Sequence, residues 1–386
     1  MDARVFFSFK ILSALSKILV LAKSLVVGFK MKYLIDVLAS TVESGGMKLH
    51  ATEMIRAWME DFPEDDLVIH GPEWIRKEFS VYNCTLEISQ NENAVFRSYN
   101  QLFRTARLAR KHATDAVISF SPIVTPFVGK RQSVAFQHDW RHKLNPQEFP
   151  LTQRLYRKLW EISAKFADIN ACISEKAELE TLRFVSGSQT FLCPNGRDHA
   201  RFWDVDNIER FQGMVVTYGH HNNKRPELVI SAFGLLRSSG NMPPGMRLTV
   251  LGAKNDYRRT LVALAEAHNV FDYVDFPGFV SAEEYVAIMT GSSVVVLVST
   301  DEGFGLPIAE AEYLRIPAVI SSDSGMAQIF GDAAIAVDPN AHDISKGILS
   351  VWNDSPVNDD ATDREPLWRW GDAVRELRRR LDGCHV

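Results

Sequence analysis

The sequence predicts an α/β protein with two domains, each a parallel sheet covered by helices. Three observations lead to this prediction. Both halves of the chain alternate short apolar runs with helical patterns, which is typical of strands joined by crossover helices. Residues Val294–Val298 are consecutively apolar, as expected for a strand buried on both faces. The chain has 386 residues, 46% of them hydrophobic and 24% charged, and this suits two medium-sized domains better than one.

The strongest pattern is the segment that follows this strand. A loop, Ser299–Gly305, leads to Pro307, which can occupy the first position of a helix because its missing N–H is not needed there. We expect this helix to run to about Leu314 and a strand to follow at Ala318–Ser321. Free backbone amides at the positive end of a helix bind phosphate. The sequence therefore predicts a diphosphate cradle formed by the amides of Gly303, Phe304, Gly305 and Leu306.

Two glutamates frame this cradle. Glu302 precedes it, and Glu310 lies eight residues later, inside the helix. A carboxylate offers two acceptor oxygens, which suits a ribose diol or a pair of hexose hydroxyls. The pair Gly303-x-Gly305 also fits the start of a dinucleotide-binding turn, but Ile308 stands where that motif needs its third glycine. A nicotinamide-dependent enzyme is therefore disfavoured.

The run from Glu302 to Glu310, with Gly-Phe-Gly-Leu-Pro between them, resembles the E-x7-E signature of family 4 glycosyltransferases. These are retaining enzymes of the GT-B fold and include a mannosyltransferase-like group 1. The resemblance implies two Rossmann-like, doubly wound domains that face each other across a cleft. It also implies that Glu302 contacts the donor sugar, that the glycine-rich backbone holds the diphosphate, and that Glu310 binds the ribose.

The first half of the chain supplies the other side of the expected cleft. An apolar strand starts at Lys32, and the turn Gly45-Gly46 leads into a helical pattern. A glycine turn at a helix N-terminus accepts anions, and the resemblance implies that Gly45 and Gly46 approach the donor phosphates. Further strands are expected at Leu67–His70, Ala116–Phe120, Ser133–Phe136 and Ala171–Ser174, with helices at Leu102–Lys111 and Glu175–Phe184.

His138 and Asp139 follow the strand Ser133–Phe136 at its carboxyl end, where open α/β sheets bind their ligands. The pair resembles the HD motif of the family, which implies that His138 lies beside the transferred sugar. A basic run follows on the next helical pattern, and it is either a solvated helix face or a contact to a phosphorylated acceptor. Its members are Arg154, Arg157, Lys158 and Lys165.

The second half begins with a strand at Met214–Tyr218 and a turn that ends at Pro226. The family uses cations of this turn to neutralise the diphosphate, so Lys224 and Arg225 are the candidates, and the sequence leaves open which of them carries the charge. Other segments that resemble the family are Phe191–Asp198, Val274–Val280 and Gly331–Pro339. The remaining elements are expected at Glu227–Leu236, Arg247–Gly252, Tyr257–His268 and, as a basic C-terminal helix, Trp368–Leu381.

No metal or other cofactor is expected. The cysteines form no C-x-x-C pair and no cluster with histidine, which predicts free thiols. Asp204 and Asp206 have the Asp-x-Asp spacing of a metal-binding pair. They fall in the expected linker, however, and no diphosphate cradle is near it. We therefore expect protein cations to neutralise the leaving group.

Charge is unevenly distributed along the chain. The formal total is −5, which does not suggest nucleic-acid binding, whereas residues 1–30 carry +4 and the remainder −9. A helix over 1–30 would place most of its Phe, Ile, Leu and Ala on one half and its lysines on the other, a pattern typical of a helix in a membrane interface. The alternative is that the protein starts in effect at Met31 and the preceding segment is a passive extension. Lysines interrupt the apolar residues too often for a spanning helix.

The sequence patterns and the resemblance together imply four segments. They are an N-terminal extension over 1–30, an acceptor-binding domain over 31–205, a nucleotide-sugar-binding domain over 206–365, and a helix over 366–386 that crosses back to the first domain. The expected function is transfer of a hexose, mannose-like by the resemblance, to a glycan or lipid-linked acceptor. We expect it in the cytoplasm, with the inner face of an anionic membrane as a further partner. The alternatives are a GT-B epimerase or hydrolase of nucleotide sugars, and a non-catalytic membrane-associated binder.

Overall fold

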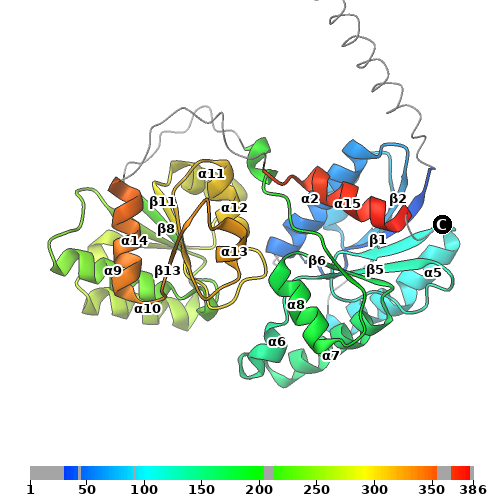
Figure 1. Cartoon of the computed structure of the whole chain (residues 1–386), viewed down its shortest axis with the longest axis horizontal. Coiled ribbons are helices and arrows are strands. Elements are labelled where there is room, and N and C mark those ends of the chain that lie inside the picture. The colour runs from blue at the N-terminus through cyan, green and yellow to red at the C-terminus, as the bar shows by residue number, and fades with distance from the viewer. Residues whose placement is uncertain (1–29, 42–44, 90–92, 204–212, 354–366, 383–386) are drawn as a thin grey trace, which may run out of the picture.

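The computed structural model describes residues 30–41, 45–89, 93–203, 213–353 and 367–382. The chain forms two α/β domains that lie side by side, each a sheet with helices on both faces (Figure 1). The helix expected over 1–30 and the aspartates Asp204 and Asp206 fall outside the described residues. Among the residues that the structure describes, no helix is long and apolar enough to cross a bilayer.

The first domain contains a 7-stranded sheet with the strand order β3-β2-β1-β4-β5-β6-β7, in which every pairing is parallel. Parallel neighbours require crossover connections, and the helices that form them bury both faces of the sheet. Its strands are β1 (Lys32–Asp36), β2 (Asp66–Gly71), β3 (Thr85–Ile88), β4 (Ala116–Ser119), β5 (Gln132–Gln137), β6 (Ile169–Cys172) and β7 (Thr190–Leu192). The main helices are α2 (Gly45–Asp61), α3 (Trp74–Phe79), α4 (Ala94–Tyr99), α5 (Thr105–Lys111), α6 (Arg141–Leu144), α7 (Leu151–Phe166) and α8 (Glu175–Phe184).

The second domain contains a 6-stranded sheet with the order β10-β9-β8-β11-β12-β13, again with parallel pairings throughout. Its strands are β8 (Met214–Tyr218), β9 (Arg247–Leu251), β10 (Val274–Gly278), β11 (Val294–Leu297), β12 (Ala318–Ser321) and β13 (Ile335–Val337). Its helices are α9 (Pro226–Ser238), α10 (Asn255–Ala267), α11 (Ala282–Gly291), α12 (Leu306–Tyr313), α13 (Met326–Phe330) and α14 (Ala341–Asn353).

The predicted fold class, two doubly wound domains, is confirmed. The largest difference from the expected elements lies around Leu102, where one helix was expected to start. The helix instead begins at Ala94, because the side chain of Asn93 accepts a hydrogen bond from the Phe96 amide and caps it. It then passes through a π-helical turn, Asn100–Arg104, before α5. The short strands β3, β7, β10 and β13 were not predicted.

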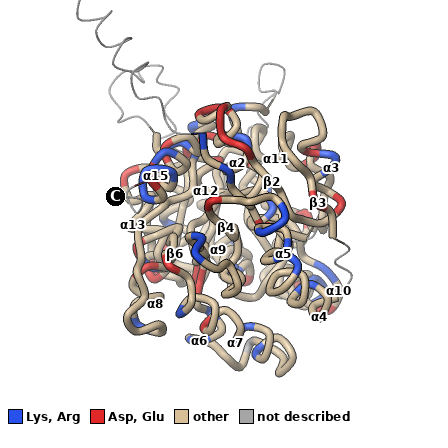
Figure 2. Tube along the Cα trace, turned by 90° about the vertical axis from the view of Figure 1, so that its right-hand side faces the viewer, with Lys and Arg blue, Asp and Glu red and all other residues tan. Residues whose placement is uncertain are grey.

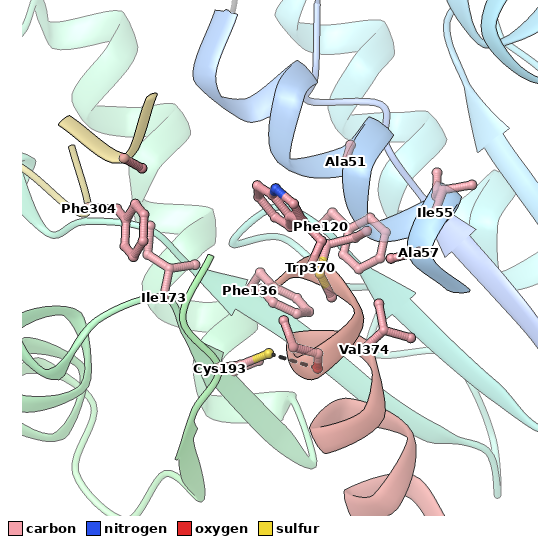
Figure 3. Close-up of a cluster of buried hydrophobic side chains, with 14 of the residues drawn as sticks. Ala51, Ile55, Ala57, Phe120, Phe136, Ile173, Cys193, Phe304, Trp370 and Val374 are labelled. Atoms are coloured by element: carbon pink, nitrogen blue, oxygen red, sulfur yellow. Dashed lines mark hydrogen bonds between the residues drawn. The ribbon is translucent and has the colours of Figure 1, made fainter. Parts of the chain in front are cut away.

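The last helix, α15 (Trp370–Asp382), belongs spatially to the first domain, where it packs beside α2 (Figure 1). Trp370 is fully buried, and its backbone amide donates to Asp198 Oδ1 at 3.0 Å. A Cβ on Gly196 would lie 2.2 Å from the Trp370 backbone nitrogen, so only glycine permits this approach. Figure 3 shows α15 presenting Trp370 and Val374 to the core, with Cys193 Sγ donating to the Ala373 carbonyl oxygen.

A buried ion pair holds the far end of α15. Arg378 Nε donates to Asp65 Oδ2 at 2.9 Å, and the two side chains are 3% and 0% exposed. Asp65 also accepts from the Trp58 indole at 3.1 Å and from the Met31 amide at 3.0 Å. Such a carboxylate contacts three segments at once, and removing it leaves the buried guanidinium of Arg378 paired with Asp382, which is largely exposed at the end of the helix.

We therefore expect Asp65→Ala to lower the free energy of unfolding of the first domain by about 3–5 kcal/mol, the usual cost of breaking a buried pair. Asp66→Ala is a matched control, because the neighbouring carboxylate pairs with Lys30 at the surface, and such pairs contribute about 0–1 kcal/mol. Urea unfolding curves of the two variants measure the difference. Equal losses would contradict the assigned role of Asp65.

Candidate active site

The site begins where β11 ends and α12 starts. Gly305 has φ of +98° and stands at the N-cap of α12, a conformation that side-chain-bearing residues rarely adopt. A Cβ there would also lie 2.8 Å from Met326 Sδ. The ring of Phe304 is buried and packs edge-on against Phe330, with 5.6 Å between the ring centroids. The segment therefore offers its backbone rather than its side chains.

Gly303 brings this backbone into contact with the first domain. A Cβ on Gly303 would lie 2.2 Å from the carbonyl oxygen of His138, at the end of β5. The nearest side-chain atom is Ile173 Cδ1 at 3.5 Å. Figure 3 shows Phe304 beside Ile173, where the buried cluster of the first domain reaches the second. The structure thus places His138 and the glycine-rich loop, which the sequence separates by more than 160 residues, directly against each other.

Two helix N-termini meet at this boundary. Gly45 and Gly46 begin α2 of the first domain, and a Cβ on Gly46 would lie 3.5 Å from Leu306 Cδ1 at the start of α12. A Cβ on Gly45 would meet no atom within 4 Å. Each helix start carries unpaired amides and about half a positive charge. The pair of helix starts therefore favours an anion at the boundary between the domains.

Lys224 and Glu302 form a salt bridge next to the start of α12. Their side chains are 11% and 13% exposed. The turn that carries Lys224 is tied to the loop of Glu302, because the Thr300 amide donates to the Asn223 carbonyl at 2.8 Å and Asn223 Nδ2 donates to the Asp301 carbonyl at 3.1 Å. The lysine of the turn is therefore the cation beside Glu302.

Arg225 is directed elsewhere. Its guanidinium donates to both carboxylate oxygens of Asp323, at 3.1 and 2.9 Å. Its backbone has φ of +50° and forms the N-cap of α9, with Pro226 at the first helical position. The sequence left open which of the two cations serves the site, and the structure places Lys224 nearer to the glutamate than Arg225.

Glu310 is buried and held by protein partners at both oxygens. His199 Nε2 lies 2.9 Å from Oε1, and the Tyr285 hydroxyl donates to Oε2 at 2.5 Å. Burial, with Glu310 beside it, raises the pKa of Tyr285 well above its usual value, so this hydroxyl stays a donor. Each carboxylate oxygen has a further lone pair for a ligand. Sequence reasoning missed His199 and Tyr285, since neither lies in a recognisable motif.

His138 is a neutral acceptor in this arrangement. Its Nε2 lies 3.1 Å from the Phe120 carbonyl oxygen, and because a carbonyl can only accept, Nε2 carries the proton and Nδ1 is left as an acceptor. Burial lowers the pKa of His138. The ring of His50 lies 4.9 Å away, and burial together with His138 lowers the pKa of His50 as well. The two rings therefore remain uncharged near neutral pH.

An ion pair between the domains involves Asp301, the residue before Glu302, and no sequence pattern indicated it. Lys176, in the first turn of α8, lies 2.5 Å from Asp301 Oδ1 and 2.6 Å from Glu180 Oε1. A second link joins Arg197 to both oxygens of Glu312 at 3.0 Å. These contacts hold α12 and its loop against the first domain.

Comparison with known proteins gives a family match over the second domain. Residues 209–367 match the family described as Glycosyl transferases group 1. The chain is 31% identical over 136 residues to the O-antigen chain mannosyltransferase B of Escherichia coli, covering 34% of this chain and 36% of that protein. It is 29% identical over 178 residues to the D-inositol 3-phosphate glycosyltransferase of Mycolicibacterium smegmatis, covering 45% and 37% of the two chains. The matches thus span just over a third of the length of these relatives.

Solved structures agree with the fold over almost the whole chain. The crystal structure of Anabaena Alr3699/HepE in complex with UDP and glucose superposes with a TM-score of 0.64 at 17% identity, and it covers 91% of this chain and 99% of that one. The fold of the chain is therefore the two-domain GT-B fold. Its second domain is the part of the chain that matches the family of group 1 glycosyl transferases.

The close approach at Gly303 yields a prediction. Gly303→Ala places a methyl group on the His138 carbonyl oxygen, so the domains have to separate by roughly 1 Å, a displacement that costs about 100-fold in rate when it misplaces reacting groups. We expect this loss in the rate of nucleotide release from a nucleotide sugar. Thermal unfolding serves as the control and should show that both domains are still folded, because the strain falls on the contact between them. A wild-type rate would show that the contact is dispensable.

Proposed function

We propose that the protein is a glycosyltransferase that moves a hexose from a nucleoside diphosphate sugar to a glycan or lipid-linked acceptor, with retention of configuration. The observation that carries the proposal is the meeting of two helix N-termini, those of α2 and α12, beside Lys224. Opposed helix starts and a lysine provide positive potential from both domains. A diphosphate, with its two negatively charged groups, is the ligand that such a site fits best.

The residues around the cradle take distinct roles in this proposal. The amides from Gly303 to Leu306 and the ammonium group of Lys224 bind the diphosphate. Glu302, next to Lys224, accepts hydrogen bonds from hydroxyls of the donor sugar. The Nδ1 atom of neutral His138 accepts a further hydroxyl across the domain boundary, where its backbone already touches Gly303. Glu310 binds the ribose through the lone pairs that His199 and Tyr285 leave open.

The chemistry asked of the protein is stabilisation of a departing nucleoside diphosphate. Negative charge grows on the leaving oxygen as the glycosidic bond breaks, and donors that are already oriented stabilise this charge without further reorganisation. The helix amides are fixed by Gly305 and Pro307, and the backbone of Lys224 is fixed by the hydrogen bonds of its turn. The hexose is proposed to be mannose-like, because one relative is named a mannosyltransferase. We place the reaction in the cytoplasm or at the inner face of the membrane.

The proposed function needs no metal ion, because cations of the protein serve the diphosphate. We therefore expect nucleotide release from a GDP-, UDP- or dTDP-sugar, in the presence of an acceptor glycan, to continue in excess EDTA. A nucleotide-release screen measures this directly. Loss of turnover in EDTA with recovery on adding Mg²⁺ or Mn²⁺ would contradict the assignment of Lys224. Release without any acceptor would favour an epimerase or hydrolase, and binding without turnover would favour a non-catalytic binder.

The two glutamates should separate nucleotide binding from transfer. Glu310→Ala should weaken the affinity for a nucleoside diphosphate by about 1–3 kcal/mol, the cost of losing a hydrogen bond that involves a charged group. Glu302→Ala should not weaken that affinity, because it frees Lys224 for the diphosphate, and it should lower the transfer rate. Glu283→Ala, an exposed position on α11, is the matched control. Calorimetry that finds wild-type affinity in Glu310→Ala would remove the ribose assignment.

A further inference from the structure

The first domain exposes many large apolar side chains on two neighbouring helical segments. The segments are α4 with its π-helical turn and, further along the chain, α7; the loop residue Phe127 lies between them in sequence. The exposed residues, with their exposed fractions, are Val95 (78%), Phe96 (62%), Tyr99 (59%), Phe103 (47%), Phe127 (50%), Leu151 (70%), Leu155 (63%), Ile162 (50%) and Phe166 (63%). We call this surface the α4–α7 face.

Contacts link several of these side chains. The rings of Phe103 and Phe127 stack with 5.4 Å between centroids, and Tyr99 lies 5.3 Å from Phe103. Arg97 of α4 lies over the ring of Tyr156 of α7 at 5.1 Å, which joins the two helices. Exposed apolar side chains grouped on neighbouring helices mark an interaction site in a folded protein.

Helix α7 shows that this exposure is not ordinary surface composition. Its fully buried positions are Ser163 and Ala164, both small. The large residues Leu151, Leu155, Ile162 and Phe166 recur at helical spacing along the outer side. A helix that only covered the sheet would turn this apolar stripe inward. The outer stripe therefore indicates a partner on the outside.

The same part of the chain is strongly basic. Residues 94–166 contain 13 Lys and Arg and 4 Asp and Glu, a formal charge of +9 in a chain whose total is −5. One of the four acids, Glu161, already pairs with Lys143 at 2.8 Å. Figure 2 shows Lys and Arg recurring along α5 and around α6 and α7. The exposed cations of these helices are Arg107, Arg110, Lys111, Arg154, Lys158 and Lys165.

We propose that the α4–α7 face docks on an anionic membrane surface. Its apolar side chains enter the interface, and its cations meet the lipid phosphates. Charge complementarity selects a lipid surface over a second copy of the chain, because a two-fold dimer through this face would bring two strongly positive patches together. The proposed attachment site is thus a folded surface, and it does not depend on residues 1–30.

The α4–α7 face lies close to the candidate active site. Tyr156 of α7 hydrogen-bonds Gln101 of the π-helical turn at 3.4 Å, and Gln101 donates to Ser121, just past the carboxyl end of β4, at 3.2 Å. The face thus borders the carboxyl edge of the first sheet, the edge that also carries His138 at the end of β5. Docking would hold this edge near the bilayer, so the acceptor is lipid-linked. This last step rests on the proposed function, whereas the docking itself does not.

The test is flotation of the full chain with vesicles of phosphatidylcholine and phosphatidylglycerol, and with pure phosphatidylcholine vesicles as a reference. Two triple variants address the face: Leu155→Ser, Ile162→Ser, Phe166→Ser removes apolar area, and Arg154→Gln, Lys158→Gln, Lys165→Gln removes charge. The control replaces exposed apolar residues outside the face, Val81→Ser, Leu235→Ser, Phe271→Ser. We expect binding to anionic vesicles to fall by about 100-fold when three cations are lost, to fall clearly in the apolar variant, and to stay unchanged in the control.

Binding should also weaken as salt is added, since the cations are exposed. Calorimetry with a nucleoside diphosphate on each variant should give wild-type affinity, which shows that the fold and the donor site are intact and separates this test from that of the proposed function. Three outcomes would overturn the proposal: no vesicle binding by the wild type, equal binding by both face variants and the control, or a loss of self-association in the face variants, which would make a second copy the occupant.

Discussion

The contact between Gly303 and the His138 carbonyl oxygen is the constraint on which the rest of the site depends. It allows the loop after β11 to approach the first domain more closely than any side chain would permit. Because of this approach, the starts of α2 and α12 lie on the same boundary, and the buried cluster of the first domain continues to Phe304. The ion pairs Lys176–Asp301 and Arg197–Glu312 then hold the loop and helix in place from either end.

The charged groups at this boundary have partners both in the free protein and in the proposed complex. Lys224 and Glu302 neutralise each other, and a buried pair of this kind costs several kcal/mol if one partner is removed. In the proposed complex, the diphosphate takes over Lys224 and the sugar hydroxyls take over Glu302, so neither charge is left unpaired. Glu310 is held by His199 from the interdomain segment, which ties the proposed ribose contact to the arrangement of the two domains.

The fold was predictable because its signals are local. The strands Met214–Tyr218 and Ala318–Ser321 and the helix Glu175–Phe184 have the expected bounds, since apolar runs, prolines and caps define them within a few residues. Strand β3 lies at the sheet edge with a mixed, partly exposed sequence, so it has no apolar run to indicate it. The partners of Arg225 and Glu310 come from elements far apart in the sequence, and no spacing rule identifies them. The sequence therefore indicates the candidate residues but not the side chains that contact them.

The central claim is that a diphosphate binds between two helix starts that belong to different domains. The most direct measurement is a crystal structure of the protein with a nucleoside diphosphate, grown in the presence of EDTA. We expect the diphosphate oxygens to lie within hydrogen-bond distance of the amides between Gly303 and Leu306 and of the Lys224 ammonium group. The turn Gly45-Gly46 should face them. A diphosphate bound away from α12, with Lys224 still paired to Glu302, would contradict the central claim.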